Sequence, residues 1–172
     1  MSYDISLSPC EGKSVGAIKG ASTRANRADC WDVIYLSFGS AHPKHHKTGK
    51  ASGEAVMKQV RCIIPVDHAT PQWFQAACEQ DTIKELRFAM HTISDDGQHV
   101  EKFIVTLTSA QIADFKVSTG TGIGDDDATS QTTNLNQIEE VLELQFVFDG
   151  ISVENVHGQS TAFATSWTGG HG

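Results

Sequence analysis

The sequence predicts a mainly β protein in which two sheets pack as a barrel or a sandwich and one short helix flanks them. Apolar residues alternate with polar ones along most of the chain, which is the period of a half-buried strand. One segment, 70–78, has the spacing of an amphipathic helix. An Asp-Gly pair between two alternating runs is typical of a hairpin turn. Many strands with a single helix are typical of this architecture.

The strands are expected in chain order wherever the period of two is clear. Residues 30–38 are apolar on both faces, so this strand needs cover on both sides. The hairpin turn falls within 94–98, where Asp96 precedes Gly97. The expected strands are 3–7, 30–38, 56–66, 84–92, 103–107, a short one around 115–117, 142–148 and an extended continuation through 151–155.

One helix is expected from Thr70 to Cys78. Thr70 provides an N-cap hydroxyl, and Pro71 stands at the first helical position, where no backbone N–H is needed. Phe74, Ala77 and Cys78 follow at i, i+3 and i+4, so they form the expected apolar face.

Two long loops interrupt the strand pattern. The stretch at about 39–55 holds Gly, Pro, His, Lys and Ser, and the stretch at about 118–136 is rich in Gly, Thr and Asp. Loops of this length in a compact domain are usually functional. A chain of 172 residues is long enough for one domain and too short for two, so a single domain over 1–172 is expected.

Composition and charge exclude several classes of function. The formal net charge of −8 argues against a nucleic-acid partner, because binding to phosphates needs clustered Lys and Arg. No stretch approaches the roughly 18 apolar residues of a membrane helix, so no membrane insertion is expected. The first residues lack a basic region followed by an apolar core, so no signal peptide is expected. The protein is expected to fold in the cytoplasm.

The cysteines agree with that compartment. They are widely spaced and contain no Cys-x-x-Cys pair, so plain thiols are expected. Cys62 and Cys78 are expected to be small buried apolar residues. The four positions are Cys10, Cys30, Cys62 and Cys78.

A search for catalytic, cofactor and metal motifs favours none of them. Gly120, Gly122 and Gly124 do not have the spacing of a dinucleotide-binding loop, and the acids at 125–127 would repel a phosphate and lack the ligand spacing of a calcium loop. The histidines at 42, 45 and 46 lie beside Lys44 and Lys47, which would oppose a metal cation. The common hydrolase and nucleotidase signatures are missing. We therefore expect a protein without cofactor or metal that is not an enzyme.

Two blocks of the chain resemble the haemolysin-coregulated protein (Hcp) family, which forms the tube of bacterial type VI secretion. The first is SGEAVMKQVRCIIPVDHATPQWFQAACEQDTIKELRF, and the second is LELQFVFDGISVENVHGQSTAFATSW. The resemblance implies a tight β-barrel of two packed sheets with one flanking helix, and a hexameric ring that stacks into a hollow tube. It also implies a spike protein at the tip, a contractile sheath, effector proteins in the lumen, and export by the machine itself from the bacterial cytoplasm.

The resemblance also changes the interpretation of two segments. In the family one long strand passes through the position of Asp149-Gly150, so a bulge or kink is expected there instead of a hairpin turn. The loop at about 39–55 corresponds to the family's ring-stacking loop. Its candidate contact residues are His42, Lys44, His45, His46, Lys47 and Lys50.

A ring supplies the second cover that strand 30–38 needs, because a neighbouring copy packs on one of its faces. Two sets of residues are therefore candidates for intersubunit packing. One face carries Trp31, Val33 and Tyr35, and the other carries Ile34, Leu36 and Phe38.

Two other functions remain open at this point. A tail-tube protein of a phage or phage-like contractile particle shares the barrel and the ring, and neighbouring genes for a capsid would indicate it. A tube protein with a fused enzyme or toxin activity is the third hypothesis, and the short stretch after Trp167 leaves no expected room for it.

Overall fold

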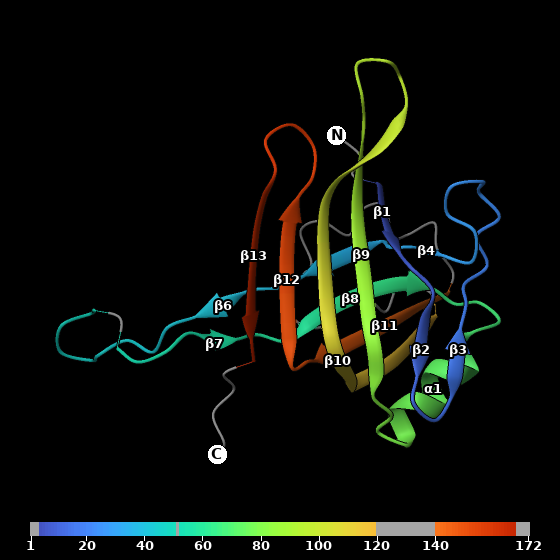
Figure 1. Cartoon of the computed structure of the whole chain (residues 1–172). Coiled ribbons are helices and arrows are strands. Elements are labelled where there is room, and N and C mark those ends of the chain that lie inside the picture. Colours follow the sequence, from blue (N-terminus) through green and yellow to red (C-terminus); the bar gives the residue numbers. More distant parts are fainter. Residues whose placement is uncertain (1–3, 51, 120–139, 168–172) are drawn as a thin grey trace.

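Two β-sheets pack against each other, and one helix lies at their edge (Figure 1). The computed structural model describes residues 4–50, 52–119 and 140–167. The front sheet has the order β3-β2-β9-β10-β12-β13, with β1 also pairing with β9 and β4 pairing with β1. The back sheet has the order β10-β11-β8-β5.

The strands of the front sheet are β1 (Asp4–Leu7), β2 (Cys10–Gly12), β3 (Gly16–Ile18), β4 (Trp31–Asp32), β9 (Ile83–Ile93), β10 (His99–Thr119), β12 (Gly150–Asn155) and β13 (Thr161–Ser166). The back sheet adds β5 (Tyr35–Ser37), β8 (Val60–Pro65) and β11 (Glu140–Val147) to the second half of β10. A separate ribbon consists of β6 (Ser40–Ala41) and β7 (Val56–Met57), and the helix is α1 (Thr70–Cys78).

Strand β10 belongs to both sheets. Its residues 103–108 pair with β12 in the front sheet, and residues 111–119 pair with β11 in the back sheet. Ser109 lies between these halves with φ of 51°, in a region that non-glycine residues rarely adopt. The sequence predicted two strands here, whereas the chain forms one strand of 21 residues with a local break.

The chain kinks at Asp149-Gly150 as expected, but the one long strand expected through this position is two strands. Strand β11 ends at Val147, and β12 begins at Gly150 and continues antiparallel to the same strand, β10. The backbone N–H of Asp149 donates to the carbonyl of Thr108 at 3.0 Å. The chain therefore bends from the back sheet into the front sheet and does not reverse.

The expected tight β-barrel is corrected to two packed sheets, because no closed barrel forms among the described residues. The predicted strand 30–38 is two short strands, with β4 paired to the front sheet and β5 paired to the back sheet. The chain crosses between the sheets at Val33, whose N–H donates to Ile5, and at Ile34, whose N–H donates to Ile63. The predicted strand 56–66 is likewise divided into β7 and β8.

Helix α1 has the predicted bounds but buries a different face. Trp73 and Ala76 are buried, while Phe74 is 54% exposed and Cys78 is exposed. The expectation of a buried face with Phe74 and Cys78 was therefore wrong. Trp73 reaches into the sandwich, with ring centroids 5.4 Å from Trp31 and 6.1 Å from Phe146. The larger indole gains more from burial than the phenyl ring beside it.

The helix also starts differently from the prediction. Ala69 occupies the N-cap position and makes no side-chain cap hydrogen bond. The Thr70 hydroxyl instead accepts the backbone N–H of Asp67 at 3.1 Å, and the Asp67 carboxylate accepts the N–H of Ala69 at 2.9 Å. These local bonds fix the turn before α1, so Thr70 stabilises the entry into the helix.

Candidate assembly surfaces

Residues 39–50 and 52–57 form an arm that projects from the packed sheets (Figure 1). At its base β6 and β7 pair, with Ser40 opposite Met57 and Ala41 opposite Val56. Towards its tip the N–H of His45 donates to the carbonyl of Lys50 at 3.0 Å. The loop predicted at about 39–55 is thus an ordered ribbon at its base and a turn at its tip.

The arm brings the predicted stacking residues together at one exposed tip. Three of them, Lys44, Lys47 and Lys50, form no ion pair within the described part of the chain. The backbone N–H of Lys47 donates to Nδ1 of His45 at 3.4 Å. The role of His42, Lys44, His45, His46, Lys47 and Lys50 in stacking stays a prediction.

The residues predicted for intersubunit packing lie in different places. Trp31 is 3% exposed and Val33 is 8% exposed, and both belong to the core of this chain. They therefore keep almost no surface for a second copy. Tyr35 is half-buried, and the guanidinium of Arg61 lies 5.5 Å from the centre of its ring. On the alternative face, Phe38 is exposed at the base of the arm.

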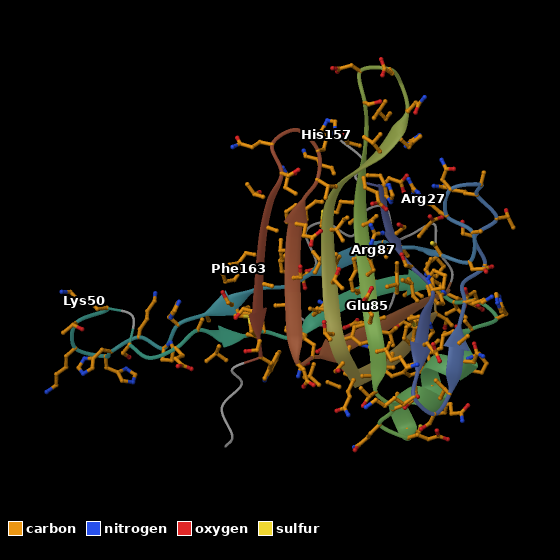
Figure 2. All side chains as sticks on the ribbon, in the orientation of Figure 1. Arg27, Lys50, Glu85, Arg87, His157 and Phe163 are labelled. Atoms are coloured by element: carbon orange, nitrogen blue, oxygen red, sulfur yellow. The ribbon has the colours of Figure 1, made fainter. Side chains whose placement is uncertain are left out.

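Strand β13 has a free edge that the sequence did not single out, and this edge is a candidate assembly surface. It pairs with β12 on one side, and no described strand pairs with its other side. Phe163 lies opposite Val153, on the face that continues the core, yet it is 70% exposed (Figure 2). An unpaired strand with a bare aromatic residue is a template for association. In the sequence, this surface is indicated only by Phe163 among small residues, and one such residue is a weak signal.

A second apolar surface lies where α1 meets β10. Phe74 packs against Phe115 with the rings tilted and their centroids 5.2 Å apart, and Val117 nearby along β10 is 45% exposed. In Figure 1, α1 and β13 lie on different sides of the molecule. The protein therefore has exposed apolar surfaces on more than one side.

The outer face of the front sheet is polar and carries small side chains. Arg87 on β9 binds Glu101 on β10 with two contacts of 2.9 and 2.6 Å. The hydrogen bond from Arg87 lowers the pKa of Glu101 below its usual range. Small residues follow towards the free edge on β12 and β13, namely Ser152, Ala162 and Ala164. Such a surface is suited to contact with water.

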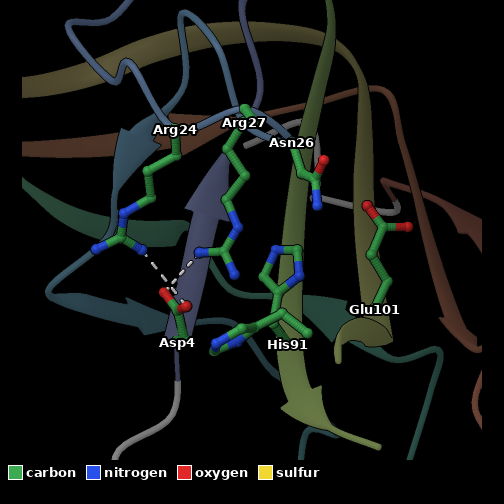
Figure 3. Close-up of a pocket in the computed structure, with 8 residues that line it drawn as sticks. Asp4, Arg24, Asn26, Arg27, His91 and Glu101 are labelled. Atoms are coloured by element: carbon green, nitrogen blue, oxygen red, sulfur yellow. Dashed lines mark ion pairs between the residues drawn. The ribbon is translucent and has the colours of Figure 1, made fainter. Parts of the chain in front are cut away.

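A pocket of about 760 Å³ opens beside β1 and the end of β9 (Figure 3). Arg27 is 8% exposed and forms an ion pair of 2.7 Å with Asp4, which Arg24 also approaches at 3.6 Å. The hydrogen bond to Arg27 lowers the pKa of Asp4. These pairs tie the segment before β4 to strand β1.

His91, which lines this pocket, also contacts a serine outside the lining. The hydroxyl of Ser6 lies 2.9 Å from Nε2 of His91, and burial, together with nearby Arg27, lowers the pKa of His91. Ser6 is only 3% exposed, so a substrate could not reach its hydroxyl. A serine nucleophile needs access to the reacting carbon. The contact is therefore best explained as part of the packing between β1 and β9.

Other candidate sites are few. The four cysteines are free thiols, and burial raises the pKa of Cys10 to about 12. Among the described residues, no group of three His, Cys, Asp or Glu side chains is placed to hold a metal. The glycines at 120, 122 and 124 and the acids at 125–127 lie outside the described residues. No helix in the described part of the chain is long and apolar enough to cross a membrane.

Comparison with known proteins identifies the family. Residues 10–154 match the family model described as "Type VI secretion system effector, Hcp". That match spans most of the sequence, so the chain belongs to the Hcp family. No curated protein matches the chain.

Solved structures show the same fold. A mutant form of Hcp1 from the E. coli EAEC 042 pathovar has a TM-score of 0.80 at 17% identity, covering 96% of this chain and 99% of that one. A structure described as Hcp protein has a TM-score of 0.81 at 17% identity, covering 98% and 100%. The secreted protein Hcp3 from Pseudomonas aeruginosa has a TM-score of 0.68 at 14% identity, covering 96% and 99%.

Family and fold together confirm the main prediction from the sequence. The protein is a tube subunit of the type VI secretion system, mainly β in structure with packed sheets. The Hcp family is a family of structural tube proteins that assemble with themselves and are secreted by this system.

Proposed function

We propose that six copies of this chain close into a ring and that rings stack into a hollow tube. Within this tube the whole chain, residues 1–172, acts as one structural domain, and the protein has no catalytic activity. The family match over residues 10–154 is the observation that carries the proposal. Apolar surfaces on different sides of the protomer support it, because a cyclic ring joins unlike surfaces of neighbouring copies.

One of these ring contacts is made by β13. Its edge is unpaired among the described strands, and Phe163 offers apolar area that no described residue of the same chain covers well. Burial of a Phe side chain contributes about 1.5–3 kcal/mol. The adjacent copy covers Phe163 and pairs with or packs against the edge of β13. Tyr35 in the back sheet and Phe38 at the base of the arm are the remaining candidates from strand 30–38 for contact with a neighbour.

The polar outer face of the front sheet lines the lumen. The Arg87–Glu101 pair is satisfied within the chain, and the small residues on β12 and β13 leave a smooth polar wall. Effector proteins travel in this lumen and are stabilised there. A spike protein closes the tip of the tube, a contractile sheath surrounds and propels it, and the machine exports the subunit from the bacterial cytoplasm without a signal peptide.

Light scattering and electron microscopy test the ring. The soluble protein is expected to have about six times the chain mass of 18.6 kDa, and the micrographs are expected to show six-fold rings with a central hole. A purified hydrolase activity that disappeared with a single His or Asp substitution would contradict a purely structural role. A protein that stays at the mass of one chain at high concentration would overturn the ring.

A further inference from the structure

The pocket beside β1 and the end of β9 gathers hydrogen-bond donors in a protein whose formal net charge is −8. Its volume of about 760 Å³ lies in the range of pockets that hold small organic ligands. Two carboxylates, those of Asp4 and Glu101, belong to the lining. The donors of the lining are the guanidinium groups of Arg24 and Arg27, the amide of Asn26 and the imidazoles of His91 and His99.

Arg27 is the charged side chain of this pocket that is most deeply buried, since it is only 8% exposed. A guanidinium carries five N–H donors. Nη1 of Arg27 lies 2.7 Å from the Asp4 carboxylate, and within the described part of the chain the side chain has no other acceptor. Buried donors on a charged group are costly to leave without an acceptor. The guanidinium therefore has donors left for an acceptor from outside the chain.

Arg24 is held only loosely by the carboxylates around it. Its Nη1 lies 3.6 Å from Asp4 and 3.8 Å from Asp32, whereas a charge-assisted hydrogen bond is about 2.7–2.9 Å long. The side chain is 57% exposed, so it can turn towards a ligand without losing a short contact. Glu101 is fully engaged, because both of its carboxylate oxygens accept hydrogen bonds from Arg87. Its repulsion of an anion is therefore offset by Arg87.

The two arginines are carried on a turn that is already closed. The backbone N–H of Arg27 donates to the carbonyl of Arg24 at 2.9 Å, and the N–H of Cys30 donates to the carbonyl of Arg27 at 3.3 Å. Figure 3 shows that Asn26 extends from the same segment, while His91 comes from β9. A ligand that joined these groups would not need to order the segment first, which lowers the cost of binding.

The histidines make the charge of the pocket depend on pH. His91 stands between Asp4 on β1 and Glu101 on β10 in the pairing of the strands. Burial, together with nearby Arg27, lowers the pKa of His91. An anion beside this ring would favour its charged form, so the anion is bound more tightly as the pH falls through the imidazole pKa. The charged and titratable groups around His91 are Asp4, Arg24, Arg27, Arg87, His99 and Glu101.

We propose that this pocket binds a small organic oxyanion, in which a carboxylate or phosphate group lies between Arg27 and Arg24. The ligand oxygens accept the free guanidinium donors and the amide of Asn26. Such paired contacts are the geometry in which arginine recognises these groups. The bound ligand connects segment 24–27 to β9 and therefore stabilises the protomer. The site is built by one chain, so it goes beyond the ring and does not depend on it.

Binding of two probe anions tests the site. Sulfate represents a phosphate group with a charge that does not change near neutral pH, and succinate represents carboxylates. Nuclear magnetic resonance follows the imidazoles of His91 and His99, and calorimetry measures the affinity, with sodium chloride keeping the ionic strength constant. We expect saturable shifts of both imidazoles. Saturation with sulfate alone or with succinate alone would identify the group that the pocket takes and would support the site.

Matched variants separate the pocket from a general effect of charge. Arg24→Gln is expected to weaken binding by about tenfold, as the loss of one charge-assisted hydrogen bond predicts. Arg27→Lys keeps the charge and loses the planar fork, and it is expected to weaken binding further. If that variant does not fold, Arg24→Gln still decides. Lys19→Gln removes an exposed cation of the same segment that pairs with Asp29 at 3.7 Å outside the pocket, and it is expected to leave binding unchanged.

The affinity for sulfate is expected to rise between about pH 7.5 and about pH 5.5, where imidazoles gain their charge. An affinity that stayed constant over this range would overturn the part assigned to the histidines. Imidazole signals that do not move with either probe would show a pocket that holds only water and would overturn the site. Equal weakening by Lys19→Gln and Arg24→Gln would also overturn it. Light scattering on the same samples reports the ring, so its failure is a separate result.

Discussion

Arg87 on β9 binds Glu101 on β10 diagonally, since Arg87 pairs with Thr106 in the backbone ladder, and two nitrogen atoms of the guanidinium contact the two carboxylate oxygens at 2.9 and 2.6 Å. Glu101 lies directly beside the register shift between β9 and β10, where the pairing moves from Glu101 to Phe103. The paired contact therefore fixes the register at the point where the backbone ladder is irregular.

Replacing the acid of this pair has a small, measurable cost. Glu101→Gln removes the charge but keeps the shape, and we expect it to lower the free energy of unfolding by about 0.5–1 kcal/mol, since the pair is partly exposed. Urea titration measures the loss. Glu11→Gln removes the more exposed pair with Lys84 and is expected to cost less, so an equal cost for both variants would contradict a special role for Arg87–Glu101.

Asp81 is predicted to make stability depend on pH. It is 5% exposed, and its carboxylate accepts the backbone N–H groups of Ser14, Val15 and Thr82 at 2.9–3.0 Å. Burial raises the pKa of Asp81, but the N–H groups outweigh burial and hold that pKa below its usual value. A lowered pKa contributes stability above the unfolded value of about 3.9, which is lost as the pH falls through the folded value.

The substitution Asp81→Asn isolates this contribution. We expect a loss of about 1–3 kcal/mol near neutral pH, because one oxygen can no longer accept the N–H groups of the β2–β3 turn. The difference from the unaltered protein is expected to shrink below about pH 4. Asp114→Asn on the exposed side of β10 serves as the control. A loss for Asp81→Asn that stayed constant with pH would contradict the ionised acceptor.

Two adjacent aromatic residues on α1 are expected to behave oppositely. Trp73 is fully buried, so Trp73→Ala is expected to cost about 3–5 kcal/mol of protomer stability. Phe74 is 54% exposed, so Phe74→Ala is expected to change it by less than about 0.5 kcal/mol. Thermal unfolding compares them, and Trp73→Phe provides a milder variant if the alanine protein does not fold. Equal losses at the two positions would contradict the observed orientation of α1.

The free edge of the front sheet leads to a prediction about the mass of the assembly in solution. Phe163→Asp places a charge on the apolar face of β13, where burial against another copy would leave it desolvated. We expect light scattering to show the mass of one chain in place of a ring, with protomer stability unchanged within about 0.5 kcal/mol. Phe163→Leu keeps the apolar contact and is expected to keep the ring. Rings formed by the aspartate variant would exclude this edge as an essential contact.

The alternation of apolar residues predicted most of the strands and the bounds of the helix, but it did not predict how strands are shared between sheets. Residues 30–38 have an uninterrupted strand pattern, yet the chain bends at Val33 and Ile34 because each pairs with a different sheet. Ser109 is another such point, since its unusual φ follows from tertiary pairing and leaves no mark in local composition. Only the resemblance to a family indicated the kink at Asp149-Gly150.

Prediction of the candidate sites was also limited because the local sequence does not record tertiary packing. The lysines and histidines of the arm were found because their composition departs from that of a strand or a core. Trp31 and Val33 were assigned to an interface because strand 30–38 is apolar on both faces. The sequence does not tell whether each face packs against the same chain or against a second copy. Phe163 was missed because its exposure depends on where the back sheet ends, which no local pattern records.

The sharing of β10 between the two sheets has a mechanical consequence. One covalent backbone of 21 residues runs through both sheets, so a force applied to either is transmitted to the other without passing only through side-chain contacts. The bend from β11 into β12 provides a second such link beside it. Sliding of one sheet over the other would therefore require strand pairing to break. When a tube is pushed along its axis, these two links resist shear between the two sheets of each subunit.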